Sequence, residues 1–247
     1  MLSVAKQNDE RAFTLIELVI VIVITGIIAT VATRKMTSTL ETARMERTVQ
    51  EMDHFAYAMV GNPDLQNSGA RTDFGYVGDV GSLPPSLDAL RSNPGGYSTW
   101  NGPYISEGVN ASTYGKDAWG SNYIYNDTLL RSVGSGSDID RLIAANTDIL
   151  LRNRVAGFVL DANNEPPGGV YRDSVVVMLM YPDGTGGTAA ISINPGVKGN
   201  FTFTNIPIGN HALRVIYIPQ TDTVTWDISV RPAGDVKLAL TFPADLW

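Results

Sequence analysis

The chain has 247 residues, which is room for about two domains of ordinary size. Its 18 Lys and Arg against 25 Asp and Glu give a formal net charge of -7, which disfavours binding to a polyanion, so we expect no nucleic-acid partner. The absence of cysteine excludes disulfides, thiolate metal sites and a cysteine nucleophile. Because the two histidines, His54 and His211, are far apart in the sequence, we expect no catalytic site and no enzyme activity.

An apolar segment occupies residues 13–33 and reads FTLIELVIVIVITGIIATVAT. As a helix rising 1.5 Å per residue, a segment of about 20 residues crosses a hydrocarbon core of about 30 Å. A polar leader, residues 1–12, precedes it, and Arg34 and Lys35 follow it directly. Basic residues therefore stand on both sides, and charge alone does not fix the orientation in the membrane.

Glu17 lies inside this apolar segment. A carboxylate in an apolar helix carries an insertion penalty of several kcal/mol and needs a partner or a function. If the chain were cut before Phe13, a free ammonium group would lie one helical turn from Glu17, and the ammonium of the same or of a neighbouring chain would neutralise it. The alternative interpretation is an interfacial acid near the start of the helix.

The sequence RAFTLIELVIVIVITGIIA resembles the class III signal of type IV pilins and type II secretion pseudopilins. The resemblance implies that a prepilin peptidase cuts between Ala12 and Phe13 on the cytoplasmic side and methylates the new amino group of Phe13. It also implies that Glu17 aligns subunits during assembly. The family usually has Gly at the position of Ala12. The alternative is an ordinary single-pass anchor.

The apolar periodicity continues beyond the membrane segment in three- to four-residue steps, with charged residues between them, and predicts one amphipathic helix to about Val60. Gly61, Asn62 and Pro63 supply the stop. The second half should pack on its own globular domain, which leaves the first half for lipid and then for neighbouring subunits. Thr25 and Gly26 are the weakest points of the helix.

Residues 61 to about 150 are rich in Gly, Asn, Ser and aromatics. The residues 102–105 and 121–125 are predicted to be strands between turns, and residues 82–90 a short helix that opens on proline. The patches DFGYVGDVGSLPPSLDAL, WNGPYI and KDAWGSNYIY are similar to the globular region of major pseudopilins. That likeness implies a small antiparallel sheet packed on the long helix.

In that family a calcium site often follows the sheet. The corresponding stretch here is LLRSVGSGSDID, which offers Asp138 and Asp140, with Asp117 and the weaker oxygen donor Ser132 as further ligands. Calcium prefers six to eight oxygen ligands. The alternative interpretation is a polar Gly/Ser turn followed by a helix cap at Asp138.

From about Val155 the sequence consists of short alternating runs with turn residues every ten or so positions and no helical stretch, which predicts a small antiparallel β-sandwich. The order GFVLD (157–161), PG (167–168), GNFTF (199–203) and IPIGNHALRV (206–215) resembles carboxypeptidase regulatory-like and transthyretin-like domains, which are not catalytic by themselves.

Few residues of this region are candidates for a site. We expect His211 to have a hydrogen-bonded structural role. The aromatics of this region that offer a sugar-binding face are Tyr171, Tyr181, Tyr217 and Trp226. Aromatics at strand spacing more often pack in a core.

The predicted fold class is α+β, with a long N-terminal helix, membrane-spanning in its first half, packed on a small antiparallel sheet and followed by an all-β sandwich. The predicted divisions are a leader (1–12), a transmembrane assembly helix (13–33), a pilin-like domain with the rest of the helix (34–153) and the sandwich (154–247).

The predicted function is a structural subunit of a type IV pilus-like filament, most closely a type II secretion pseudopilin. The expected partners are copies of itself, other pilin-like subunits, the prepilin peptidase, an inner-membrane assembly platform and a separate motor ATPase. We expect a single pass through the bacterial inner membrane before assembly and a periplasmic or cell-surface filament after it, with calcium as the one cofactor to test. The alternative is a minor subunit whose sandwich acts as an adhesin or substrate-binding module.

Overall fold

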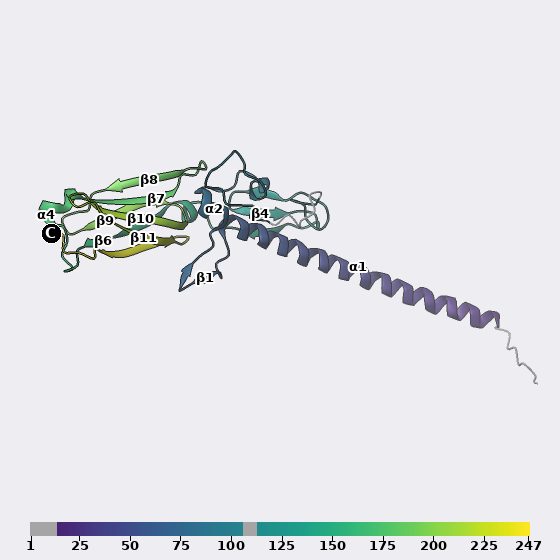
Figure 1. The fold of residues 1–247 in the computed structure, drawn as a ribbon. Helices are drawn as coiled ribbons and strands as arrows, with labels where there is room; N and C mark the ends of the chain where they lie inside the picture. Colours follow the sequence, from purple (N-terminus) through teal and green to yellow (C-terminus); the bar gives the residue numbers. More distant parts are fainter. Residues whose placement is uncertain (1–13, 106–112) are drawn as a thin grey trace, which may run out of the picture. The chain divides into compact units, whose positions relative to one another are not determined.

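The computed structural model describes residues 14–105 and 113–247. The chain divides into two compact units, the first ending at Glu46 and the second running from Arg47 to Trp247. The elements are a long helix, small antiparallel sheets and two larger sheets, so the predicted α+β class is confirmed (Figure 1). The leader and the predicted cleavage site, Ala12 and Phe13, lie outside the described residues.

Helix α1 runs from Leu15 to Val60 without interruption, as predicted. Its described residues are exposed up to Arg47, and only its last turns contribute buried side chains, which are Thr48, Met52, Phe55, Ala56, Ala58 and Met59. Gly61 ends the helix with a left-handed φ of 79° while its N–H donates to the carbonyl of Tyr57 at 2.7 Å. Glycine takes this conformation without the steric cost of a Cβ.

The part of the second unit that precedes the sandwich is built on the end of α1. Its elements are β1 (Gln66–Asn67), β2 (Ala70–Arg71), α2 (Gly75–Val80), η1 (Leu87–Leu90), β3 (Ile124–Asn126), β4 (Leu129–Ser132), β5 (Ile139–Leu142) and α3 (Asp148–Leu151). The three strands β3, β4 and β5 form an antiparallel sheet. Met52, Phe55 and Met59 of α1 pack in one core with Tyr76 of α2 and Leu130 of β4. The predicted small antiparallel sheet on the long helix is therefore confirmed.

Two local predictions in this part are wrong. Residues 102–105 form no strand, because Pro103 has no N–H to donate to a ladder and the ring of Trp100 fills the space beside Gly102. Residues 82–90 form a helix only from Leu87 to Leu90, since Pro84 and Pro85 remove two backbone donors ahead of it.

The sandwich consists of two sheets with the strand orders β11-β10-β7-β8 and β12-β6-β9. Its strands are β6 (Asn153–Leu160), β7 (Val175–Pro182), β8 (Thr188–Ile193), β9 (Asn200–Ile206), β10 (Gly209–Tyr217), β11 (Asp222–Val230) and β12 (Asp235–Thr241). Inward-facing residues of both sheets, such as Val155, Leu179, Phe203 and Leu213, form a single core.

The predicted β-sandwich is confirmed, but two details of the prediction, its antiparallel pairing and the absence of helical stretches, do not hold throughout. Strand β12 pairs in parallel with β6, and the connection before β7 contains α4 (Gly168–Tyr171) and η2 (Arg172–Ser174). The alternation of apolar residues identifies a strand but carries no information about its direction.

The sandwich packs on the preceding part through a separate, smaller buried cluster. Ile208 packs in one buried cluster with Phe74 and Val77 of α2 and with Leu150 of α3. The backbone N–H groups of Ile208 and Ala233 donate to the carbonyls of Leu150 and Ile149 at 2.8 and 2.9 Å. The boundary predicted between 153 and 154 therefore marks a change of architecture inside one compact unit.

Candidate assembly segment and acidic loop

Glu17 lies in the first turn of α1 and contacts Thr14, the residue that precedes the helix. Its backbone N–H donates to Thr14 Oγ1 at 3.3 Å, and the Thr14 hydroxyl donates to Glu17 Oε2 at 3.5 Å. The Thr14 hydroxyl thus caps the start of the helix by accepting from the N–H three residues later, and the Glu17 carboxylate accepts from the same hydroxyl. Thr14 was not among the predicted site residues, although the Thr-x-x-Glu spacing is its signal.

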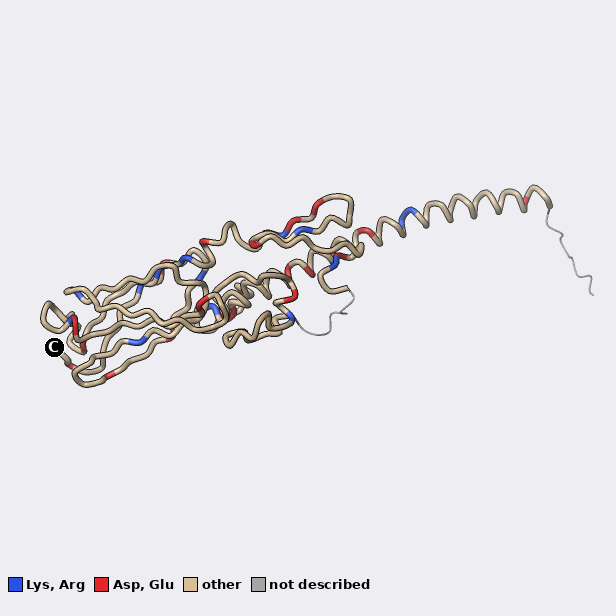
Figure 2. Tube along the Cα trace, turned by 90° about the horizontal axis from the view of Figure 1, so that it is seen from above, with Lys and Arg blue, Asp and Glu red and all other residues tan. Residues whose placement is uncertain are grey.

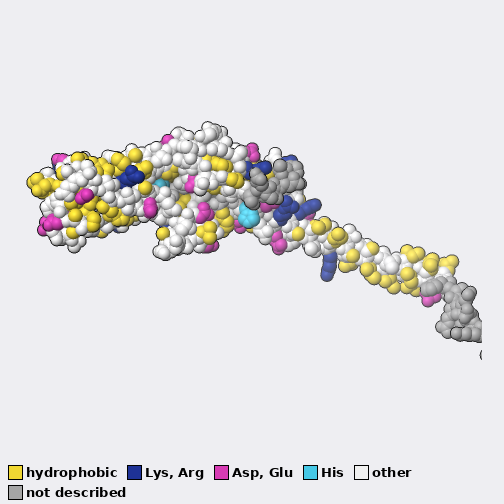
Figure 3. Space-filling model, viewed as in Figure 1, with side chains coloured by type: hydrophobic (Ala, Val, Ile, Leu, Met, Phe, Trp, Pro, Cys, Tyr) yellow, Lys and Arg dark blue, Asp and Glu magenta, His cyan; other side chains and the backbone are white. Residues whose placement is uncertain are grey.

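The first half of α1 presents a continuous apolar surface. Leu15, Ile16 and Leu18 are 82%, 66% and 54% exposed. Hydrophobic side chains follow the helix in Figure 3, and Figure 2 shows a long uncharged stretch of the helix between an acidic and a basic position. Within the part of the chain that the structure describes, α1 is the one helix long and apolar enough to cross a membrane, with a mean hydropathy of 2.8 and no buried side chain in that window.

Threonine hydroxyls in this half of the helix are satisfied within the helix itself. Thr25 donates to the carbonyl of Val21 at 2.8 Å, and Thr30 donates to the carbonyl of Gly26 at 2.8 Å. A hydroxyl bonded in this way places no unpaired polar group in an apolar environment, and the same bond tends to bend a helix. The weak point predicted at Thr25 and Gly26 stays a prediction.

Asp117 joins the segment before β3 to the end of β4 and the turn that follows it. Its carboxylate accepts hydrogen bonds from the backbone N–H groups of Trp119, Ser121 and Gly134 and from the Ser132 hydroxyl, at 2.7 to 3.0 Å. Burial by itself raises the pKa of Asp117, but the four hydrogen bonds outweigh it, and the pKa lies below its usual 3.8. This carboxylate is a structural acceptor for the loop.

Asp138 and Asp140 both contact Arg131. The Arg131 guanidinium donates to Asp140 at 2.6 and 2.7 Å and lies 2.8 Å from Asp138. The hydrogen bond from Arg131 holds the pKa of Asp140 below its usual value. Arg131 and Asp140 are direct cross-strand partners in β4 and β5, which explains their contact.

The predicted calcium ligands are thus divided between two arrangements. Asp138 and Asp140 share one guanidinium, while Asp117 contacts Ser132 and backbone amides. Over residues 14–105 and 113–247, no three His, Cys, Asp or Glu side chains are grouped as a metal would need. Calcium stays a prediction, and its binding at Asp138 and Asp140 would require the Arg131 guanidinium to move away.

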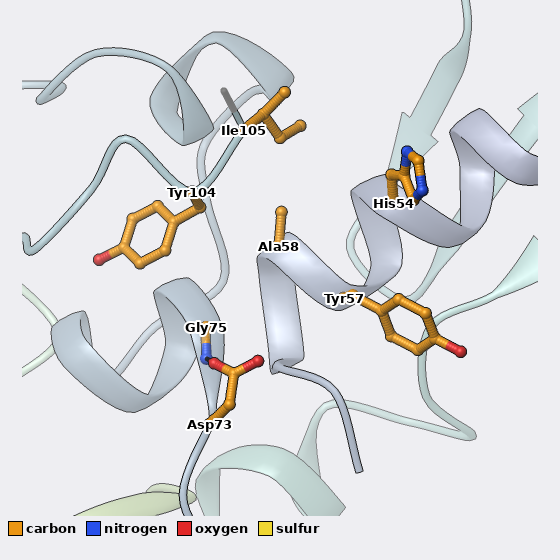
Figure 4. Close-up of a pocket in the computed structure, with 7 residues that line it drawn as sticks. All are labelled: His54, Tyr57, Ala58, Asp73, Gly75, Tyr104 and Ile105. Atoms are coloured by element: carbon orange, nitrogen blue, oxygen red, sulfur yellow. Dashed lines mark hydrogen bonds between the residues drawn. The ribbon is translucent and has the colours of Figure 1, made fainter. Parts of the chain in front are cut away.

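A cleft of about 300 Å³ lies between the end of α1 and α2 and is lined by His54, Tyr57, Asp73 and Tyr104, among others (Figure 4). The Asp73 carboxylate accepts hydrogen bonds from the backbone N–H groups of Asn62 and Gly75 at 2.7 and 3.0 Å. The hydroxyl of Tyr104 donates to Asp79 at 2.8 Å. These acids therefore fasten the turn after α1 and the segment after η1.

In the sandwich, His211 and the aromatic residues have structural positions. His211 is buried, its Nε2 lies 2.8 Å from the carbonyl oxygen of Pro207, and burial lowers its pKa despite this hydrogen bond. Tyr217 is in the core, and Tyr181 and Trp226 pack against it. Of the four aromatics considered for a sugar-binding face, Tyr171 is the exposed one, so they do not form a common face.

The N-terminal segment is similar to a known protein family. Residues 7–33 match the family model described as the prokaryotic N-terminal methylation motif. The segment is a prepilin-type methylation motif. The motif spans the predicted cleavage site, Glu17 and the apolar half of α1, and it covers a small part of the chain. No curated protein matches the sequence.

Solved structures resemble parts of the chain only distantly. A dioxygenase domain from Streptomyces sp. SirexAA-E is 14% identical over 41% of this chain and 85% of its own, with a TM-score of 0.28. The major pilin subunit of Bacillus cereus is 10% identical over 46% of this chain and 36% of its own, with a TM-score of 0.27. A streptococcal ancillary pilin is 13% identical over 48% and 43%, with a TM-score of 0.26. TM-scores below 0.5 support no functional inference.

Proposed function

We propose that this chain is a structural subunit of a type IV pilus-like filament, most closely a type II secretion pseudopilin. The observation that supports the proposal is the prepilin-type motif at residues 7–33, which leads directly into a helix whose apolar first half has no buried side chain. In the precursor, lipid covers this surface. In a filament, the same surface packs against the helices of other subunits.

Moving an apolar helix from lipid to a bundle of apolar helices gives little hydrophobic free energy, because lipid tails are as apolar as the side chains. Polar contacts therefore contribute strongly to specific association. We infer that cleavage between Ala12 and Phe13 creates an ammonium group at Phe13, and that this group neutralises Glu17 of a neighbouring subunit. Glu17 then exchanges its local contact with Thr14 for an intermolecular ion pair.

The proposal requires partners outside this chain. A prepilin peptidase cleaves and methylates the N-terminus, an inner-membrane platform receives the processed subunit, and a motor ATPase drives extrusion. The subunit crosses the inner membrane once before assembly and is periplasmic or on the cell surface afterwards.

The test is the variant Glu17→Ala with Glu46→Ala as the matched control, because Glu46 is an exposed acid of the same helix beyond the apolar segment. We expect Glu17→Ala to insert into the membrane and to be processed normally, but to enter filaments at least tenfold less than wild type. Glu46→Ala should behave as wild type. Quantitative immunoblots of membrane and filament fractions measure both, and wild-type incorporation of Glu17→Ala would contradict the charge pairing.

A second candidate function is ligand binding by the sandwich of a minor subunit. The outer face of β6 carries Phe158, which is 51% exposed beside a hollow of about 280 Å³ lined also by Arg154, Asn200 and Lys237. An exposed aromatic ring next to an amide and cations is suited to a polar ligand such as a glycan. Binding of the full-length chain to a glycan array, lost in Phe158→Ala, would favour this function.

A further inference from the structure

Strand β8 is an edge strand of the four-stranded sheet, and its outer backbone groups have no partner strand among the described residues. It pairs with β7 in an unbroken register from Thr188 to Ile193 and contains neither a charged residue nor a proline. A regular, uncharged edge of this kind is a template for adding another strand, and natural proteins usually protect such edges.

The other edge strands have a protecting feature. Strand β11 carries Asp222 and Asp227, and β12 carries Asp235 and Lys237. Strand β9 shifts register against β6. Outside the sandwich, β5 carries Asp140 and Arg141, β3 has 3 residues, and β1 and β2 have 2 each. Lysine, other charges, bulges and short length are the usual means of keeping strands from pairing. Strand β8 is the exception among the described strands.

We propose that the outer edge of β8 is an interface with a second copy of this chain, an inference that rests on the proposed function as a filament subunit. Two copies with a net charge of -7 repel each other, so they approach most easily where acidic residues are missing. Between 184 and 206, Lys198 is the only charged residue. Subunits of a filament meet through two different surfaces, and Lys198 beside β8 is opposite in sign to the net charge of the copy that it would meet.

Strand addition at β8 would also complete the packing beside it. Ile191 and Ile193 point toward the core but are only partly buried, and Val197 in the following loop is 51% exposed. A neighbouring strand would cover these side chains while it satisfies the free backbone groups.

The experiment compares Ala190 on β8 with Ala239 on β12, since both are exposed alanines on edge strands of the sandwich. A photoreactive phenylalanine analogue replaces each residue in turn in the full-length chain, which is irradiated in its own membrane. We expect position 190 to give a cross-linked dimer of this chain in at least fivefold higher yield than position 239. Equal yields, or a cross-link from position 190 to a different protein, would overturn the inference.

A second pair of variants measures the consequence for assembly. Ala190→Lys should reduce the amount of filament at least fivefold with no change in thermal stability, whereas Ala239→Lys should leave both unchanged. Filaments are counted by electron microscopy alongside the cross-linking. Filaments without a dimer from position 190 would refute the β8 interface but not the filament, while a dimer from that position without filaments would refute the proposed function but not the pairing.

Discussion

At the scale of single residues, acidic side chains have three different tasks in this chain. Glu17 accepts a hydrogen bond from Thr14, which caps α1. Asp117 accepts four hydrogen bonds that join the segment before β3 to the end of β4 and the turn after it, and Asp140 pairs with Arg131 across two strands. The Thr-x-x-Glu spacing was readable in the sequence. The partners of Asp117 were not, because two of them, Ser132 at the end of β4 and Gly134 in the turn after it, are brought near only by folding.

Replacing Asp117 by Asn should lower the free energy of unfolding by about 2–4 kcal/mol, since an amide nitrogen at one oxygen position cannot accept the bonds from Ser132 and Gly134. Because folding lowers the pKa of Asp117, its stabilisation is complete above the unfolded pKa of 3.8 and is lost as the pH falls below that value. Chemical denaturation at pH 7 and pH 3 measures this. The difference between wild type and variant should shrink at pH 3, and a constant difference would contradict the role of the charge.

Calcium binding is tested at Asp138 and Asp140. If calcium binds at Asp138 and Asp140, millimolar calcium should raise the melting temperature of the wild type but not of Asp138→Asn. No rise in the wild type would leave Arg131 as the partner of both carboxylates.

At the scale of elements, the sequence was most informative where a pattern is local. The apolar period of α1 and the glycine after Val60 predicted the helix and its end correctly, and the alternating runs predicted most strands of the sandwich. The parallel pairing of β12 with β6 depends on a contact between residues about 80 positions apart, which alternation does not encode. The close junction between the sandwich and α2 was missed for the same reason, since it depends on Ile208 packing on Phe74 and Val77.

Ile208→Ala should destabilise the second unit by about 2–5 kcal/mol, because it leaves a cavity in the cluster where α2, α3 and the sandwich meet. Ile218→Ala, at a position that is 53% exposed, should change stability by less than about 0.5 kcal/mol. Urea unfolding followed by tryptophan fluorescence compares the two. An equally small effect at Ile208 would mean that the sandwich and the preceding part are not coupled through this cluster.

At the scale of the whole molecule, the two units have surfaces suited to different surroundings. The unit that ends at Glu46 exposes an apolar helix that suits lipid or other helices, whereas the unit from Arg47 to Trp247 has its own buried cores. This division fits a subunit that is held in a membrane first and in a filament afterwards. In the proposed pathway, cleavage between Ala12 and Phe13 is the step that connects the two states.

The most direct test of the proposed function is the intact mass and N-terminal residue of the protein purified from its own membrane. We expect a chain that begins at an N-methylated Phe13 and lacks residues 1–12, as a processed filament subunit would. A chain that retains Met1 and the leader would contradict it, and the protein would then be a membrane-anchored β-sandwich protein that does not enter the pilin pathway.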